Sequence, residues 1–252
     1  MYNFNLSNGG YGYFRKKKFE PYDTQEMFKQ GEEYVPRRKV LHEGIKAKFL
    51  ENQHIAILIG GGSGVGKSSA IKKFVLPIFM KNFVLIDADE IKERLPEYKF
   101  FKKNNCLDAS DYVHEESSDL AKMLIGEAIQ NERSFIYDAT MSKYEKYVDL
   151  IGELRKKDYN IHILFIDADV EVALERAAAR FLNEDGSIGR YVSEDVVRET
   201  NINSANTFLR IINDVDGYTL INNDGVPIVI ATERKVEKPD LYDLFKKKTE
   251  QL

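Results

Sequence analysis

The residues with the most evident chemical potential lie between Gly61 and Ser69, in the segment GGSGVGKSS. Residues 61–68 fit the pattern G-x-x-x-x-G-K-[ST], in which a glycine-rich turn leads to a lysine and a hydroxyl side chain. In such a turn the backbone N–H groups point at phosphate oxygens, and the following helix directs its positive end at the same anion. The segment therefore predicts binding of nucleotide phosphates rather than a plain glycine-rich turn.

We expect the nucleotide to be ATP, bound together with Mg²⁺. In this pattern Lys67 reaches the β- and γ-phosphates, and the Ser68 hydroxyl holds Mg²⁺. The residues expected to surround the phosphates are Gly61, Gly62, Ser63, Gly64, Val65, Gly66, Lys67, Ser68 and Ser69.

Two carboxylates, Asp87 and Asp89, follow the next apolar run, about one helix downstream of Lys67. A carboxylate there can accept a proton from a hydroxyl and orient its oxygen toward the γ-phosphorus. We expect Asp89 to be this base. Asp87 is the alternative base and a candidate substrate contact, because strand alternation would place both side chains on one face. The structural alternative for either residue is a cap on the helix that begins near Glu90.

A further carboxylate, Asp138, ends the apolar run at 134–138. We expect Asp138 to lie near the substrate and on the Mg²⁺ side of the site, with water between the ion and the carboxylate. Thr140 lies beside it and could bond to phosphate or substrate; a helix cap is its structural alternative.

Three arginines form the last candidate group. Arg176 and Arg180 are spaced i, i+4, so they share one face of a predicted helix. Arg190 follows across a glycine-containing loop. Arginines that close over ATP can neutralise the charge of the transferred phosphate, so we expect a lid in which Arg176 and Arg190 assist transfer and Arg180 contacts the nucleotide. A solvated helix face is the alternative for Arg176 and Arg180.

Strands that alternate with helices must position these residues. Apolar runs predict strands at 55–59, 83–86, 134–138 and 161–166. Helical patterns lie at 40–49, 69–74, 90–95, 111–130, 143–156, 170–181, 194–212 and 241–248, and a hairpin is expected over 218–231. This order predicts an α/β fold with a doubly wound, mainly parallel sheet and a C-terminal hairpin. Ligands of such sheets lie beyond the carboxyl ends of the strands.

Composition narrows the function classes. The chain has 252 residues, of which 43% are hydrophobic, enough for one large core. Its net charge of -4 provides no general basic field for nucleic acid. The single cysteine, Cys106, suits a reducing compartment. Because no run approaches a membrane span and the first residues lack the pattern of a signal peptide, we expect a cytoplasmic protein without a membrane partner. Residues 1–35 are expected to form an N-terminal arm, flexible or not, and 36–252 one catalytic domain.

The ordered set of segments resembles the zeta-toxin family of P-loop kinases. The similar segments are GGGSGVGKSS, VLIDADEIKERLPEY, FIYDATMSK, LERAAARF and DGYTLINNDGVPI, and the likeness covers about 35–231. The resemblance implies ATP-dependent phosphorylation of a hydroxyl on UDP-N-acetylglucosamine, and a small antitoxin protein that blocks the nucleotide site. It also implies the phosphate-loop role for Lys67, the base role for Asp89, substrate contacts for Asp138 and Thr140, and phosphate clamping for Arg176 and Arg190.

One departure concerns the acceptor. The family has a glutamate that contacts the sugar where this sequence has Lys122. Two other functions therefore remain open: a 5′-hydroxyl kinase of polynucleotides or nucleosides, which the net charge disfavours, and a nucleotide-gated binding module without transfer chemistry.

Overall fold

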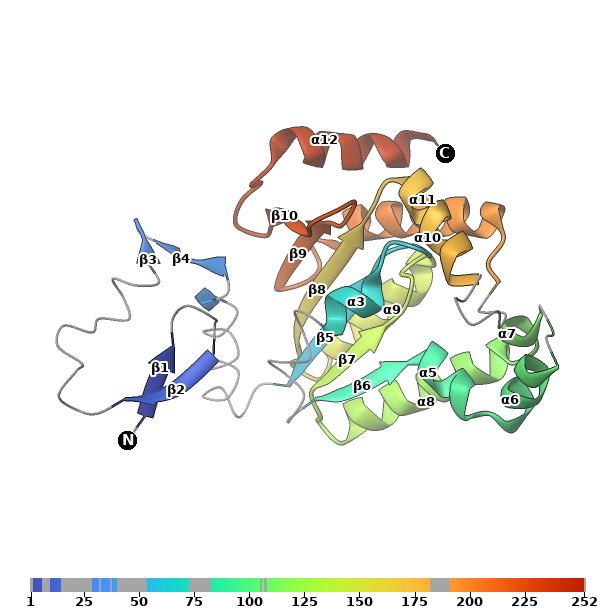
Figure 1. Cartoon of the computed structure of the whole chain (residues 1–252). Coiled ribbons are helices and arrows are strands. Elements are labelled where there is room, and N and C mark those ends of the chain that lie inside the picture. Colours follow the sequence, from blue (N-terminus) through green and yellow to red (C-terminus); the bar gives the residue numbers. More distant parts are fainter. Residues whose placement is uncertain are drawn as a thin grey trace. The chain divides into compact units, whose positions relative to one another are not determined.

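A computed structural model describes residues 2–5, 10–14, 29–31, 33–36, 38–39, 54–72, 83–104, 106, 108–181 and 191–251 (Figure 1). The chain divides into two compact units, Met1–Phe49 and Leu50–Leu252. In the first unit, β1 (Tyr2–Asn5) pairs antiparallel with β2 (Gly10–Phe14), and β3 (Lys29–Gln30) pairs antiparallel with β4 (Glu33–Tyr34). The helix predicted over 40–49 lies outside the described residues, and the arm over 1–35 stays a prediction.

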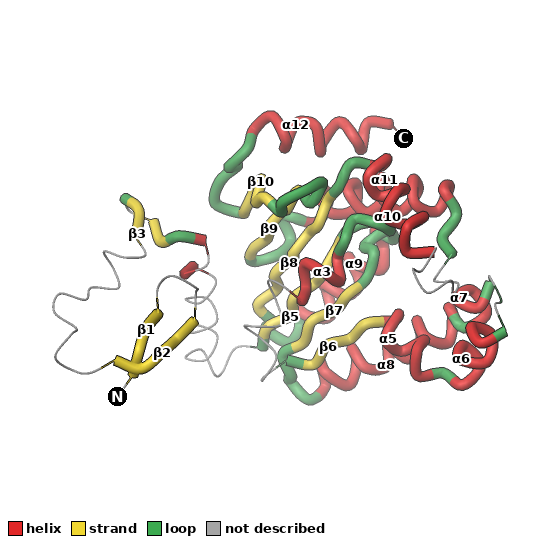
Figure 2. The backbone as a smooth tube through the Cα atoms, in the orientation of Figure 1, coloured by secondary structure: helices red, strands yellow, loops and turns green. Residues whose placement is uncertain are grey.

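The second unit is built on one sheet of strand order β10-β9-β8-β5-β7-β6. All neighbouring strands are parallel except β9 and β10, which form an antiparallel hairpin. The strands are β5 (Ile55–Gly60), β6 (Val84–Asp87), β7 (Phe135–Asp138), β8 (Asn160–Asp167), β9 (Gly217–Asn222) and β10 (Ile228–Thr232). Figure 2 shows these strands side by side with helices around them. The predicted fold class is confirmed.

Helices cover both faces of this sheet. The helices described in this unit are α3 (Lys67–Ala70), α5 (Ala88–Arg94), α6 (Pro96–Lys103), α7 (Ala109–Tyr112), α8 (His114–Gln130), α9 (Tyr144–Arg155), α10 (Val170–Phe181), α11 (Glu194–Ile211), α12 (Pro239–Lys248) and the short 3₁₀ helix η3 (Thr249–Gln251). Of these, α6 and α7 pack in a small cluster of their own. One core joins the sheet to α8, α9, α12 and the end of α11. A second core lies on the other face and joins the sheet to α3 and α10. Apolar residues that alternate along β5 and β7 supply both cores, as expected for strands buried on two faces.

The buried face of α8 differs from the prediction. The apolar residues of the pattern at 111–130 predict that Leu120, Met123 and Leu124 face the core with Ile125, but Met123 is 64% exposed and the two leucines are also exposed. The helix instead buries its smaller residues Ser117, Ala121 and Ala128 together with Ile125 and Ile129. Small side chains let the helix lie close to the sheet, so the bulkier residues lie on its outer side.

The parallel register brings the strand ends to one edge of the sheet. Asp87 at the end of β6 is paired with Asp138 at the end of β7, and Asp138 is paired with Ile59 of β5. On the other side, Asp167 at the end of β8 is paired with Asn222 at the end of β9. Polar residues therefore follow the apolar strands along one edge, beside the start of the phosphate loop.

Candidate active site

The phosphate loop connects β5 to α3, as the sequence pattern predicts. Gly66 is the residue before α3 and has a left-handed conformation with φ 88°. A Cβ atom at Gly66 would lie 2.5 Å from the Asn223 side chain. Both the backbone conformation and the close approach therefore require glycine at this position.

Lys67 lies folded over the loop. Its Nζ donates hydrogen bonds to the carbonyl oxygens of Gly61 at 2.8 Å and Gly62 at 2.9 Å. The Gly61 N–H donates to the carbonyl of Thr140 at 3.3 Å, which ties the phosphate loop to the segment after β7. Ser68 and Ser69 are exposed in the first turn of α3. The loop thus presents its lysine and hydroxyl groups at the carboxyl edge of the sheet.

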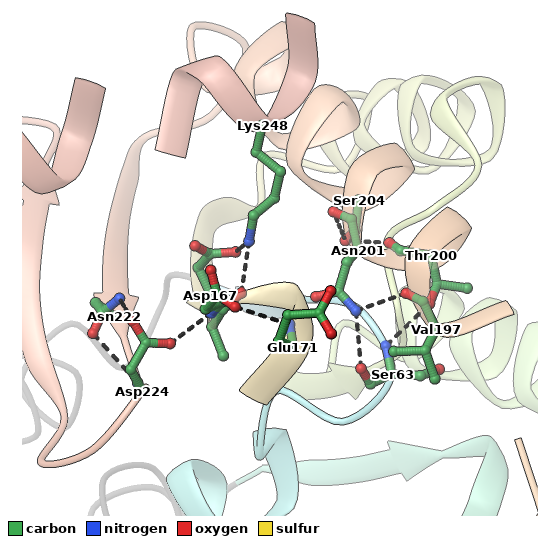
Figure 3. Close-up of polar contacts among 12 residues, drawn as sticks. Ser63, Asp167, Glu171, Val197, Thr200, Asn201, Ser204, Asn222, Asp224 and Lys248 are labelled. Atoms are coloured by element: carbon green, nitrogen blue, oxygen red, sulfur yellow. Dashed lines mark hydrogen bonds and ion pairs between the residues drawn. The ribbon is translucent and has the colours of Figure 1, made fainter. Parts of the chain in front are cut away.

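Helix α11 holds the other side of the loop (Figure 3). The Ser63 N–H donates to Thr200 Oγ1 at 3.1 Å, and Asn201 Nδ2 donates to the Ser63 carbonyl at 3.0 Å. A Cβ atom at Gly62 would lie 2.5 Å from Asn201 Cγ, so the loop passes directly over this buried side chain. No local pattern in the sequence marks Thr200 or Asn201 as supports of the loop, because they lie on a helix more than 130 residues downstream of Ser63.

The turn between β9 and β10 provides a third support. Asn223 Nδ2 donates to the carbonyl of Val65 at 2.7 Å. Arg176 on α10 donates from Nη2 to the carbonyl of Asp224 at 2.9 Å, and its buried Nη1 has no hydrogen-bond partner among the described residues. Arg176 Nη1 lies 3.9 Å from the Cβ position of Gly66, so this arginine is next to the phosphate loop.

The other two arginines of the predicted lid lie elsewhere. Arg180 is exposed on α10, one turn beyond Arg176. Arg190 lies outside the described residues. The structure therefore brings Arg176 to the loop, and a role for Arg180 and Arg190 stays a prediction.

Strand alternation predicted that Asp87 and Asp89 lie on one strand with their side chains on the same face. This prediction is wrong. Strand β6 ends at Asp87, and Asp89 is in the first turn of α5. Asp87 is the N-cap of that helix, and its Oδ1 accepts from the Asp89 N–H at 2.8 Å. A capping side chain satisfies an otherwise unpaired helix donor, so Asp87 fixes the start of α5 while Asp89 projects from its first turn.

Asp89 has a buried lysine beside it. Lys92 Nζ lies 3.4 Å from Asp89 Oδ1 and donates to Ser110 Oγ of α7 at 3.0 Å. Lys92 is only 3% exposed, whereas the Asp89 side chain is 56% exposed. A buried cation needs a partner, and Asp89 is a nearby carboxylate, so Lys92 restrains and orients the expected base.

Asp138 is 8% exposed and has one buried carboxylate oxygen, Oδ1, without a hydrogen-bond partner among the described residues. Burial raises its pKa to about 7; the positive charge of Lys67 acts in the opposite direction, and the charges of Asp87 and Asp89 raise it further. These mutual effects place the lysine of the phosphate loop and three carboxylates within electrostatic reach of one another. This is the group that sequence analysis expected to meet at the strand ends.

Thr140 follows Asp138 in a constrained segment. Its hydroxyl lies 3.1 Å from the Ser142 hydroxyl, and the buried Met141 between them has a positive φ of 62°. Helix α9 begins at Tyr144 with Lys143 as its N-cap residue, so the alternative of a Thr140 helix cap is wrong. A non-glycine residue in this conformation costs energy, which suits a segment held in place beside a site.

The carboxyl end of β8 carries a carboxylate that sequence analysis did not single out. Asp167 Oδ1 accepts from Lys248 Nζ at 2.6 Å, and the same ammonium donates to the Ala168 carbonyl at 2.6 Å (Figure 3). Burial raises the pKa of Asp167 to about 6, against the lowering effect of Lys248. The signal was its place directly after a predicted strand; the partner, 81 residues away, had none. This ion pair fastens the end of α12 to the edge of the sheet.

Comparison with known proteins now identifies the family. The sequence model of the family described as "Zeta toxin" matches residues 41–235. The chain belongs to the zeta toxin family. No helix in the described part of the chain is long and apolar enough to cross a membrane.

Curated relatives of this zeta toxin family member include kinases. A calmodulin calcium-dependent NAD kinase of Arabidopsis thaliana is 31% identical over 116 residues, which are 43% of this chain and 21% of that protein. Toxin PezT of Streptococcus pneumoniae is 23% identical over 136 residues, 54% of this chain and 53% of that protein. An L-seryl-tRNA(Sec) kinase of Methanococcus maripaludis is 28% identical over 126 residues, 49% of this chain and 45% of that protein. The matches span at most about half the length of these relatives.

Solved structures agree on the fold. A chain from the PezAT toxin–antitoxin system of S. pneumoniae has a TM-score of 0.58 at 14% identity, over 87% of this chain and 98% of that one. A chain of the AvrRxo1-ORF1:-ORF2 complex with ATP has a TM-score of 0.56 at 20% identity, over 84% of this chain and 73% of that one. Both likenesses concern the fold, a mainly parallel sheet in which the phosphate loop joins β5 to α3.

The residues present are compatible with Mg²⁺ held mainly by nucleotide phosphates. Within the described residues, no group of three His, Cys, Asp or Glu side chains could hold a metal ion. Mg²⁺ commonly keeps several waters and takes only one or two protein ligands beside phosphates. The exposed Ser68 hydroxyl and Asp138 Oδ1, which has no hydrogen-bond partner among the described residues, are oxygen ligands of the kind that Mg²⁺ prefers.

Proposed function

We propose that this zeta toxin family member is an ATP-dependent kinase that transfers the γ-phosphate to a hydroxyl of a small molecule, with UDP-N-acetylglucosamine as the first candidate acceptor. The observation that carries this proposal is that Asp87 and Asp138 end adjacent strands, with Lys67 of the phosphate loop and Asp89 of α5 within electrostatic reach of Asp138. The names of the curated relatives support phosphoryl transfer to a hydroxyl.

In the proposed reaction, Asp89 accepts the proton of the acceptor hydroxyl while the hydroxyl oxygen bonds to the γ-phosphorus. The bond from that phosphorus to the β–γ bridging oxygen breaks, and ADP leaves. Asp87 holds the start of α5 and Lys92 restrains the Asp89 carboxylate, so the oxygen is aimed rather than strongly activated.

On the nucleotide side of the site, positively charged side chains compensate the negative charge of the ATP phosphates. Lys67 exchanges its contacts with Gly61 and Gly62 for the phosphates, and Arg176 offers its unpaired Nη1. Mg²⁺ supplies further neutralisation of the phosphate charge when bound, and we assign Ser68 and, through water, Asp138 to its site. Thr140 is assigned to the phosphate or the acceptor, and Arg180 and Arg190 to the lid.

NAD is a second candidate acceptor, because the relative with 31% identity is named as an NAD kinase. UDP-N-acetylglucosamine and NAD both carry a diphosphate next to sugar hydroxyls, so the same site could select either by its outer contacts. A polynucleotide acceptor is disfavoured by the net charge of -4.

A protein partner and a cellular setting follow from the same family. A chain of the PezAT toxin–antitoxin system shares the fold, which supports a toxin whose nucleotide site an antitoxin blocks. The cytoplasmic location, expected from the single cysteine and from the absence of an apolar run and of a signal-peptide pattern, stays a prediction.

The test is ADP release by purified protein with Mg²⁺-ATP and, in turn, UDP-N-acetylglucosamine, NAD, a 5′-hydroxyl oligonucleotide or no acceptor. We expect release that depends on one of the first two, and mass spectrometry should then find that acceptor heavier by one phosphate. Acceptor-independent release would favour an ATPase, and ATP binding without release would favour a binding module; either result would reject the kinase.

A further inference from the structure

Two consecutive residues of the turn that joins β9 to β10 contact the nucleotide side of the site. Asn223 donates from its backbone N–H to the Asp167 carbonyl at 2.8 Å and from Nδ2 to the Val65 carbonyl at 2.7 Å. The next residue, Asp224, accepts from Arg176 through its backbone carbonyl. A hairpin turn needs none of these bonds to reverse the chain, because they join the turn to β8, to the phosphate loop and to α10.

Asp224 contacts α10 at two points. Its carbonyl oxygen accepts from Arg176 Nη2 at 2.9 Å, in the second turn of the helix. Its Oδ1 accepts from the N–H of Asp169, the residue before α10 begins at Val170. Its Oδ2 accepts from Asn222 Nδ2 at 2.8 Å (Figure 3). Because both carboxylate oxygens are bonded, the carbonyl of the same residue has a fixed position relative to α10.

Helix α10 lies directly against the phosphate loop. A Cβ atom at Gly64 would lie 2.2 Å from the Ala173 carbonyl oxygen. A Cβ atom at Gly66 would lie 2.5 Å from Asn223 Nδ2 and 3.9 Å from Arg176 Nη1. The turn, the helix and the loop therefore meet at the residue before α3, so a shift of the turn would move the guanidinium relative to the loop.

The partner that holds Arg176 leaves its charge uncompensated. Nη2 meets a neutral carbonyl, and the buried Nη1 has no hydrogen-bond partner among the described residues. A carbonyl orients a guanidinium without neutralising it, so the charge stays available to an anion. An arginine side chain also has much rotamer freedom to lose, and a partner that fixes it before the ligand binds removes that cost from the reaction.

We propose that Asp224 is a positioning residue that acts through Arg176. Its carboxylate, bonded to Asp169 and Asn222, fixes its own carbonyl, and this carbonyl orients the guanidinium so that Nη1 faces the phosphates of the bound nucleotide. Asp224 itself does not touch the nucleotide in this role. The role depends on its oxygen acceptors and not on its negative charge, so an asparagine should serve nearly as well.

The inference rests on the proposed function, in which Arg176 compensates the phosphate charge during transfer. The first experiment measures kcat for ADP release at saturating Mg²⁺-ATP and acceptor. Asp224→Ala should lower kcat about tenfold and leave the KM of the acceptor unchanged, because the guanidinium loses its fixed position. Asp224→Asn keeps an oxygen for the Asp169 N–H, so its kcat should stay within about threefold of the unchanged protein. Asp149→Ala, an exposed change on α9, is the control and should have no effect.

A double variant separates positioning from a general effect on folding. If Asp224 acts only through Arg176, then adding Asp224→Ala to Arg176→Ala should lower kcat no further than Arg176→Ala alone. Two independent effects would multiply, and this result would overturn the inference. Because Asp224 is exposed, its variants should melt within a few degrees of the unchanged protein.

Nucleotide binding tests the same role without turnover. Calorimetry with Mg²⁺-ATP should show weaker binding by Arg176→Ala and by Asp224→Ala, and the double variant should bind as Arg176→Ala does. If no acceptor supports ADP release, the kinase is rejected, and this non-additive affinity alone retains the positioning role. ADP release with kcat and ATP affinity unchanged in Asp224→Ala would retain the kinase and remove the positioning role.

Discussion

The two halves of the site differ in how their polar groups are held. On the nucleotide side, the backbone of the phosphate loop is bonded by side chains of two distant elements, Thr200 and Asn201 of α11 and Asn223 of the turn after β9. On the acceptor side, Asp138 has a buried carboxylate oxygen without a hydrogen-bond partner among the described residues, and the Asp89 side chain is 56% exposed. One half is a supported backbone cradle, whereas the other holds charges that a ligand could compensate.

This difference follows from what each half must bind. The phosphates of ATP always present the same charged oxygens, so a cradle of N–H groups for them can be formed before the nucleotide binds. The acceptor brings a hydroxyl whose position decides the rate, and charges left incompletely paired cost stability until it arrives. The comparison predicts that substitutions on the nucleotide side weaken ATP binding. Substitutions on the acceptor side should alter phosphoryl transfer or folding stability and leave ATP binding unchanged.

Lys67→Ala should have the largest effect. It removes the ammonium that we assign to the transferred phosphate, and we expect transfer to fall about 10³-fold or more, with weaker ATP binding. Single-turnover rates with radiolabelled ATP measure it. Lys72→Ala, an exposed change just after α3, is the control and should retain full transfer. Normal transfer by Lys67→Ala would mean that the nucleotide is held differently.

Asp89→Asn should leave ATP binding unchanged and slow transfer on the order of 10²–10³-fold, because the amide cannot accept the hydroxyl proton. Calorimetry with ATP and ADP release with acceptor measure the two quantities separately. Glu93→Gln on the same helix, where Glu93 pairs with Lys102 on the surface, should change neither. Transfer that survives in Asp89→Asn would shift the base role to Asp87.

Asn201→Ala should weaken nucleotide binding about tenfold, because it leaves the Ser63 carbonyl without its donor and opens space under Gly62. The loss of a buried hydrogen bond should also lower the free energy of unfolding by about 1–3 kcal/mol. Calorimetry and urea titration measure the two effects. Asn203→Ala alters a surface bond to Glu199 on the same helix and should leave ATP affinity unchanged.

Asp138→Asn should act on stability in a pH-dependent way. The pKa of Asp138 is about 7 in the folded chain against 3.8 for the ordinary group, so between about pH 4 and 7 the folded chain keeps a proton that the unfolded chain has released. Stability is therefore lost as pH rises through this window.

Without nucleotide, Asp138→Asn should be more stable than the unchanged protein at pH 8, by on the order of 2 kcal/mol, and little different at pH 4. Melting curves across this range measure the effect. The exposed Asp149→Asn should not show it. A parallel pH dependence for Asp138→Asn and the unchanged protein would contradict the assigned pKa.

The structural features that depend on residues close together in the sequence were predicted well. The strands and most helices of the second unit lie where periodicity predicted them, but α6 was not predicted, and the helix predicted over 111–130 is divided between α7 and α8. Lys67, Asp87, Asp89 and Asp138 come near one another because parallel strands end at one edge. The prediction of the buried face of α8 was wrong, because small residues, rather than Leu120 and Met123, face the sheet. Helical spacing alone could not tell which of two apolar stripes would be buried.

The sequence by itself determined the phosphate loop, the alternation of strands and helices, and the carboxylates at the strand ends, since these depend on neighbours within a few residues. Only the tertiary structure decided that Asn201 supports Ser63 and that Lys248 neutralises Asp167. The same holds for the burial that raises the pKa of Asp138 and the pairing of Lys146 with Tyr137. Contacts between distant segments and the loss of water around a charge arise from packing, and no local pattern in the chain records them.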